Sequence, residues 1–116
     1  MGREILFGND LTVQRLDEPR RGTVFFDGPI IVIRRGGETY AAEKLDKLVR
    51  FMERKAMYNG RFREAAKVVA GPMVARASRA SEFWGEEGFD QPLRESLVNT
   101  IADEILAHFE HEYEGA

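Results

Sequence analysis

The residues best suited to binding a metal lie near the carboxyl end of the chain. The only two histidines, His108 and His111, are three positions apart, and Glu104 lies one helical turn before His108. On a helix, this spacing places the three side chains on one side, as a metal site requires. Three ligands from one helix would nevertheless leave a metal open to solvent, and the chain has no cysteine to complete the site. We therefore interpret them as polar positions beside an apolar stripe, and predict no metal or cofactor.

Catalytic motifs are not visible in the sequence. Ser78, Ser81 and Ser96 occur outside any nucleophile-elbow pattern. Glu43 and Lys44 are adjacent, so the Glu-x-Lys spacing of strand-based nucleases is missing. The glycines in residues 26–29 and 34–39 are typical of hairpin turns, and no glycines form a loop that would cradle a phosphate. We predict a non-enzymatic protein without catalytic residues. An enzyme whose site is assembled from distant residues stays an alternative.

Charge is sorted along the chain, although the formal net charge is only −3. Residues 1–43 carry 6 basic and 7 acidic side chains, residues 44–80 carry 10 and 3, and residues 81–116 carry 1 and 10. The near-neutral total therefore hides a basic middle and an acidic end, and an asymmetry of this size calls for an interpretation.

Three interpretations of this asymmetry stay open. In the first, basic and acidic helices pack side by side and neutralise each other through exposed ion pairs, each worth about 0–1 kcal/mol. In the second, the basic segment 44–80 contacts nucleic-acid phosphates. In the third, the acidic end docks on a basic surface of another protein, where complementary charge favours fast and selective association. The residues assigned to nucleic-acid binding are Arg61, Arg63, Lys67, Arg76 and Arg79.

Large aromatic side chains mark the border between the basic and acidic segments. Phe83 and Trp84 are followed by Gly85, and Phe89 follows Gly88. In one interpretation these aromatic residues anchor the core and close the end of the helical layer. In the other they form an exposed interface hot spot, because tryptophan is enriched at such sites. A third interpretation gives Trp84 both roles, with one ring face buried and the ring edge exposed. The residues assigned to protein binding are Trp84, Phe89, Glu104, Glu110 and Glu112.

The elements that position these residues change character near residue 41. Residues 3–40 contain short apolar or alternating runs separated by turn signals, which predicts an antiparallel β-meander of four or five strands. One predicted strand, residues 23–26, precedes the hairpin dipeptide Asp27-Gly28. Residues 29–35 form the most strand-like run, and the last predicted strand is residues 38–40.

Residues 41–116 have helical periodicity and predict about three helices. The first is expected over residues 41–59. The second starts near Arg61, and Gly71-Pro72 should break or kink it because proline lacks an amide hydrogen. Asp90 is expected to cap the last helix, with Pro92 in its first turn. Strands followed by helices indicate an α+β fold in a single domain over residues 1–116.

Composition narrows the compartment and the partners. The absence of cysteine fits a reducing cytosol, and the first residues lack the apolar core of an export signal, so we expect a cytoplasmic protein. No apolar run is long enough to span a bilayer, so we expect no membrane partner. The sequence favours a small interaction module with a protein partner, such as an adaptor, an assembly factor or an inhibitor. An origin in a phage or another mobile element is a hypothesis that does not follow from the residues. A nucleic acid is the alternative partner, and self-association is a further one.

Overall fold

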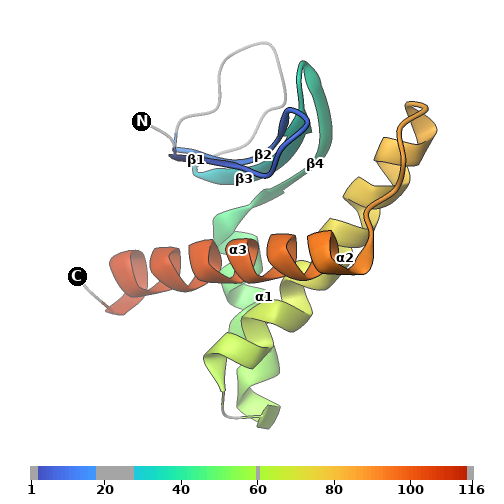
Figure 1. The fold of residues 1–116 in the computed structure, drawn as a ribbon. Helices are drawn as coiled ribbons and strands as arrows, with labels where there is room; N and C mark the ends of the chain where they lie inside the picture. Colours follow the sequence, from blue (N-terminus) through green and yellow to red (C-terminus); the bar gives the residue numbers. More distant parts are fainter. Residues whose placement is uncertain (1–2, 18–27, 60, 115–116) are drawn as a thin grey trace.

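The computed structural model describes residues 3–17, 28–59 and 61–114 of the chain. They form a four-stranded antiparallel sheet followed by three helices, which confirms the predicted α+β fold (Figure 1). The strands are β1 (Arg3–Leu6), β2 (Leu11–Leu16), β3 (Ile30–Arg35) and β4 (Glu38–Lys44). The helices are α1 (Leu45–Asn59), α2 (Phe62–Phe83) and α3 (Gln91–Phe109), and a π-helical turn η1 (Glu110–Glu114) continues α3.

The sheet is a meander, because its strands lie in the order in which the chain makes them. β2 pairs directly with β3, with Val13 opposite Ile33, and β3 turns into β4 at Gly36, whose φ is +56°. Glycine suits that turn because it adopts a positive φ without steric cost. The predicted strand over residues 23–26 lies outside the described residues.

The boundary between the last strand and the first helix differs from the prediction. Residues 41–44 continue β4 and pair with β3, so α1 begins at Leu45 and the predicted start at residue 41 is wrong. β3 contains four consecutive buried residues, Ile30–Ile33, whose backbone groups need partners inside the protein. Pairing with residues 41–44 supplies these partners, so the sheet overrides the local helical periodicity.

Helix α2 runs without a break through Pro72, so of the break or kink predicted at Gly71-Pro72 the break is wrong. In a regular helix the amide of residue 72 would bond to the carbonyl of Val68, and proline cannot donate that bond. Pro72 is exposed, and the Val68 side chain is 53% exposed. We infer that water solvates the free carbonyl on this outer side, so the helix continues.

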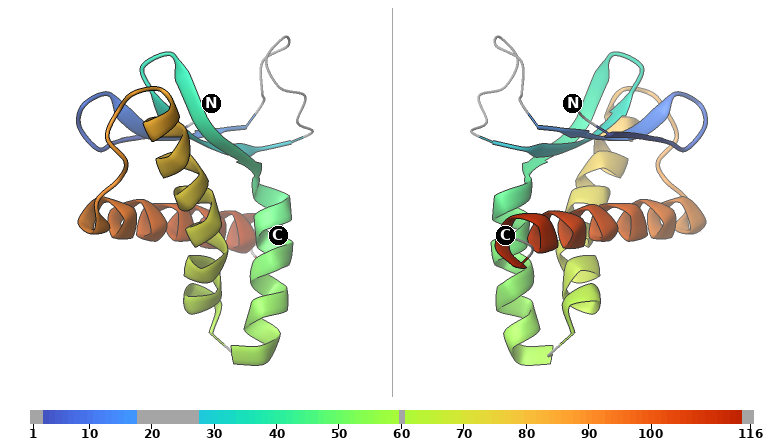
Figure 2. Two further views of the ribbon diagram at one scale, coloured as in Figure 1. Left: turned by 90° about the vertical axis from the view of Figure 1, so that its right-hand side faces the viewer. Right: turned by 90° about the vertical axis from the view of Figure 1, so that its left-hand side faces the viewer.

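The helices lie against one face of the sheet and enclose the core. Figures 1 and 2 show α1 and α2 side by side and antiparallel, with α3 crossing this pair beneath the sheet. Side chains from both layers meet in one apolar cluster. Its largest fully buried members include Ile31, Ile33, Leu45, Met52, Met73, Leu97, Ile101 and Ile105.

Buried hydroxyl groups on α2 hold the loop between α2 and α3. The Oγ atom of Ser78 accepts hydrogen bonds from the backbone amide of Phe89 (2.9 Å) and from Nη2 of Arg94 (3.2 Å). The Oγ of Ser81 donates to the carbonyl of Glu87 at 2.9 Å. Arg94 also donates through Nε to the carbonyl of Phe89 at 3.0 Å. The loop is therefore pinned to α2 by side chains from both neighbouring helices.

The start of α3 is as expected. The carboxylate of Asp90 accepts a hydrogen bond from the amide of Leu93 at 3.0 Å, and Pro92 occupies the first turn. Because an N-cap satisfies an otherwise free amide, this bond fixes where the loop ends.

We expect Ser78→Ala to lower the free energy of unfolding by about 1–3 kcal/mol, because it leaves the buried amide of Phe89 without an acceptor. Urea denaturation followed by circular dichroism measures this change. The matched control is Ser96→Ala, an exposed serine on α3, where we expect a change within about 0.5 kcal/mol. Equal losses in the two variants would contradict a structural role for the Ser78 hydroxyl.

Candidate functional site

The carboxyl end of α2 exposes two large aromatic side chains. Phe83 is 82% exposed and Trp84 is 54% exposed. Their rings meet edge to face, with centroids 5.7 Å apart and planes at 88°. Three exposed glutamates lie within three residues of them in the sequence. We call the group the acidic tip, which consists of Glu82, Phe83, Trp84, Glu86 and Glu87.

The acidic tip has a defined backbone. The amide of Trp84 donates a hydrogen bond to the carbonyl of Ala80 at 3.1 Å, and the amide of Gly85 donates one to the carbonyl of Glu82 at 3.0 Å. Gly85 has a φ of +84°, the left-handed conformation that commonly ends a helix. The aromatic pair is therefore presented on a closed helix end.

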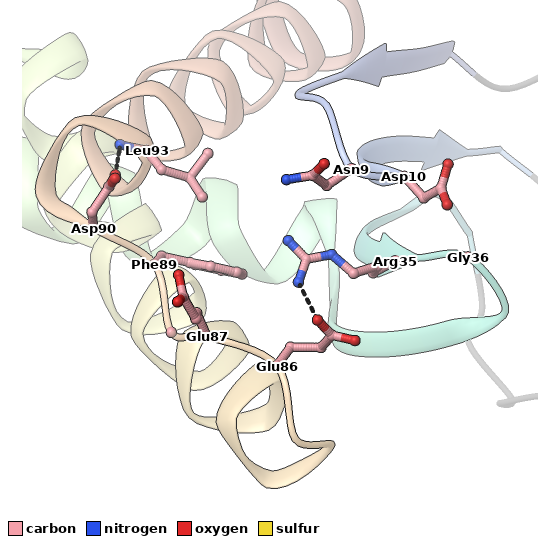
Figure 3. Close-up of a pocket in the computed structure, with 10 residues that line it drawn as sticks. Asn9, Asp10, Arg35, Gly36, Glu86, Glu87, Phe89, Asp90 and Leu93 are labelled. Atoms are coloured by element: carbon pink, nitrogen blue, oxygen red, sulfur yellow. Dashed lines mark hydrogen bonds and ion pairs between the residues drawn. The ribbon is translucent and has the colours of Figure 1, made fainter.

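A cavity of about 620 Å³ lies between the acidic tip, the turn after β1 and the turn after β3. Figure 3 shows Arg35 pointing into it from the sheet, with Phe89 and Leu93 on the opposite wall. An Nη atom of Arg35 lies 3.8 Å from a carboxylate oxygen of Glu86, and its guanidinium lies 5.9 Å from the ring centroid of Tyr40.

Negative charge prevails around this cavity. Four carboxylates line it against the single guanidinium of Arg35, namely those of Asp10, Glu86, Glu87 and Asp90. An added anion would meet repulsion from these groups, whereas a cationic side chain would be attracted. The charge of the cavity therefore favours a cationic group over an anionic one.

The structure separates the residues that the sequence assigned to protein binding. Trp84 is 54% exposed, so its interpretation as a fully buried core anchor is wrong and the one with a buried ring face and an exposed edge stays open, whereas Phe89 is 5% exposed and does anchor the core. Glu104 is 3% exposed, so the expectation that it belongs to an exposed acidic face is also wrong. Glu110 and Glu112 are exposed at the far end of α3.

The three metal candidates do not share one environment. His108 is 1% exposed, and its Nε2 lies 2.7 Å from a carboxylate oxygen of Asp46 on α1. The His111 side chain is 77% exposed, and its Nε2 lies 3.8 Å from Oε1 of Glu112. Within the described ranges, no three histidine or carboxylate side chains gather as a metal site would require. The interpretation of Glu104 and His108 as polar edge residues is wrong, because both are buried.

The five cations assigned to nucleic-acid binding point in different directions. Arg63 forms an ion pair with Asp103 of α3 at 2.6 Å, and Lys67 lines a cavity between α2 and α3. Arg76 instead pairs with Glu43 of β4 at 2.7 Å. Arg61 and Arg79 are exposed and have no ion pair within the part of the chain that the structure describes. Of these five cations, Arg63 is the one that forms an ion pair with the acidic helix α3, so the predicted neutralisation between helices is observed at this position.

A second surface, which the sequence analysis did not identify, lies at the other end of α2. A cavity of about 480 Å³ opens between the last turns of α1 and the first residue of α2. Met57 is 84% exposed and Phe62 is 41% exposed there. We call this surface the basic groove, lined by Arg50, Glu53, Arg54, Ala56, Met57 and Phe62. The sequence could have indicated this surface, because Met57 lies off the apolar stripe of its helix and an apolar side chain there is expected to be exposed.

Comparisons with family models, curated proteins and solved structures found no match to this chain. None of the described helices combines the length and the apolar character that crossing a bilayer would require. The geometry of the acidic tip and of the basic groove is therefore the basis for assigning a function.

We expect the fluorescence of Trp84 to resemble that of a solvated indole, because more than half of this side chain is exposed. Trp84 is the only tryptophan, so the emission spectrum reports on this residue alone. Its maximum should lie near that of N-acetyltryptophanamide and acrylamide should quench it readily. A blue-shifted emission that moves to longer wavelength on unfolding would contradict this placement.

Proposed function

We propose that this chain is a small non-enzymatic interaction module that binds a protein partner through the acidic tip. The observation that carries the proposal is the exposed Phe83–Trp84 pair at the closed end of α2. Large aromatic side chains supply much of the binding free energy at protein interfaces, and tryptophan is the most enriched among them.

The aromatic pair offers binding free energy that folding does not use. Fully burying a large apolar side chain contributes about 1.5–3 kcal/mol, and Phe83 leaves most of this unused. The loop behind the pair is held by Ser78 and Ser81, so little ordering is needed on association. Preorganisation of this kind increases affinity because it reduces the entropy lost on binding.

Charge selects the partner at this site. Glu82, Glu86 and Glu87 flank the aromatic pair, and carboxylates also prevail in the adjacent cavity. A segment with an apolar anchor and neighbouring Lys or Arg side chains would match both features. Phosphate groups would be repelled, which favours a protein over a nucleic acid at the acidic tip.

We expect a selection from a displayed random-peptide library to enrich Arg- or Lys-containing sequences with an apolar residue. Trp84→Ala should lose most of this enrichment, because it removes the central aromatic contact. Val68→Ala is the matched control, since Val68 is exposed on the same helix away from the tip. Retention of the same peptides by the Trp84 variant would contradict the proposal.

Binding of nucleic acid by residues 44–80 stays the alternative function, and we expect it to be absent or weak. Fluorescence anisotropy with labelled single- and double-stranded DNA and RNA tests it at about 50 and about 200 mM salt. The comparison variant combines Arg61→Ala with Arg79→Ala, because of the five cations assigned to nucleic-acid binding these two are exposed and form no ion pair in the described ranges. Micromolar binding that collapses at the higher salt and weakens in this variant would instead establish the alternative.

A further inference from the structure

The two ends of α2 carry surfaces of opposite character. Phe62, its first residue, lines the basic groove, whereas Phe83, its last residue, belongs to the acidic tip. A helix of this length separates its ends by about 30 Å, at 1.5 Å per residue. Figure 1 shows the end of α1 and the start of α2 at one extreme of the helical layer, and the far end of α2 at the other. A single chain therefore cannot place its own tip in its own groove.

The basic groove has the chemistry to receive an aromatic anchor. Met57 and Phe62 provide an apolar floor that solvent reaches, and methionine adapts readily to the shape of an aromatic partner. Phe62 is held in place because its ring stacks on Phe109 of α3, with centroids 5.0 Å apart. The floor of the groove is therefore apolar and open to solvent, and the core holds Phe62 in position.

Two guanidinium groups flank this apolar floor. Arg50 and Arg54 are exposed, and neither forms an ion pair within the residues that the structure describes. Arg54 lies 5.9 Å from the ring centroid of Phe51, so it already makes a cation–π contact at this surface. Carboxylates beside an incoming aromatic ring would pair with these arginines, although Glu53 in the lining offsets part of their charge.

We propose that the basic groove of one chain binds the acidic tip of a second copy of the same chain. This inference rests on the proposed function, because it names a partner for the same tip. Phe83 and Trp84 would cover Met57 and Phe62, and the tip glutamates would approach Arg50 and Arg54. Both surfaces expose apolar side chains, and their charges are complementary, as specific association requires.

Association of this kind joins unlike surfaces, so it is heterologous. Each added copy leaves one free tip and one free groove, which produces rings when the rotation closes and open chains when it does not. The contact is small compared with a permanent dimer interface, so assembly should be reversible and depend on protein concentration. It should also weaken as salt screens the charged pairs.

Sedimentation velocity over a range of protein concentrations tests the inference on the full chain. We expect the wild type to form species larger than a monomer, and to dissociate on dilution and at higher salt. Trp84→Ala should remain a monomer, as should a groove variant that combines Arg50→Glu with Arg54→Glu. Val68→Ala should behave like the wild type. Circular dichroism checks that every variant is folded.

Mixing the two monomeric variants provides the sharpest test. The Trp84→Ala chain keeps an intact groove, and the groove variant keeps an intact tip, so their mixture should form heterodimers and nothing larger. A chain that adds Glu86→Arg and Glu87→Arg to the groove variant reverses both surfaces, and its self-association should return. This rescue also excludes misfolding as the cause of the monomeric state.

Several results would overturn the inference. These are a wild type that stays monomeric at all concentrations, a groove variant that associates normally, and a mixture without heterodimers. Different results would contradict the proposed function. The groove variant has an intact tip, so its selection of basic peptides tests the tip whether or not the chain associates with itself. Loss of peptide selection by Trp84→Ala together with a monomeric wild type would keep the proposed function and discard this inference.

Discussion

The buried hydroxyl of Ser78 is the contact on which the candidate site depends. It accepts hydrogen bonds from the Phe89 amide and from Arg94, so it fixes the chain where α2 gives way to α3. Phe89 can then enter the core while the residues just before it stay outside. Because a buried amide without a partner costs more than an average hydrogen bond contributes, few other loop conformations can compete. The exposure of Trp84 follows from this anchoring.

The length of α2 also contributes to the exposure of the aromatic pair. Its inner side packs small residues such as Ala70 and Ala77 against the other elements, while its carboxyl end rises beside the edge of the sheet (Figure 1). The hydrogen bonds of the closed helix end satisfy the backbone there, so no further layer is needed to cover it. Apolar side chains at such an end contribute little to folding, and they remain available for association.

The sequence was sufficient for the fold class because periodicity depends on local burial. Alternation in residues 11–16 and the stripe of the last helix both reflect which side chains face the core. The element boundaries and the buried polar contacts could not be predicted, because they depend on contacts between distant parts of the chain. The pairing of residues 41–44 with β3, and the contact of His108 with Asp46, join segments that no local pattern connects. The sequence assigned both Trp84 and Phe89 to protein binding, but only Trp84 is exposed. Which of the two is buried depends on hydrogen bonds to Ser78, which no local pattern reveals.

The sorting of charge along the chain acquires a spatial meaning through α2. Helix α3 crosses back over α2 and brings Asp103 to Arg63, so part of the basic and acidic charge is neutralised there. Such pairs are exposed and contribute little to stability, so they do not account for the whole asymmetry. Arg54 and Glu87 lie near opposite ends of α2, too far apart to neutralise each other within one chain. Charges separated in this way do not stabilise the fold by mutual attraction, which supports the proposal that their segregation serves association.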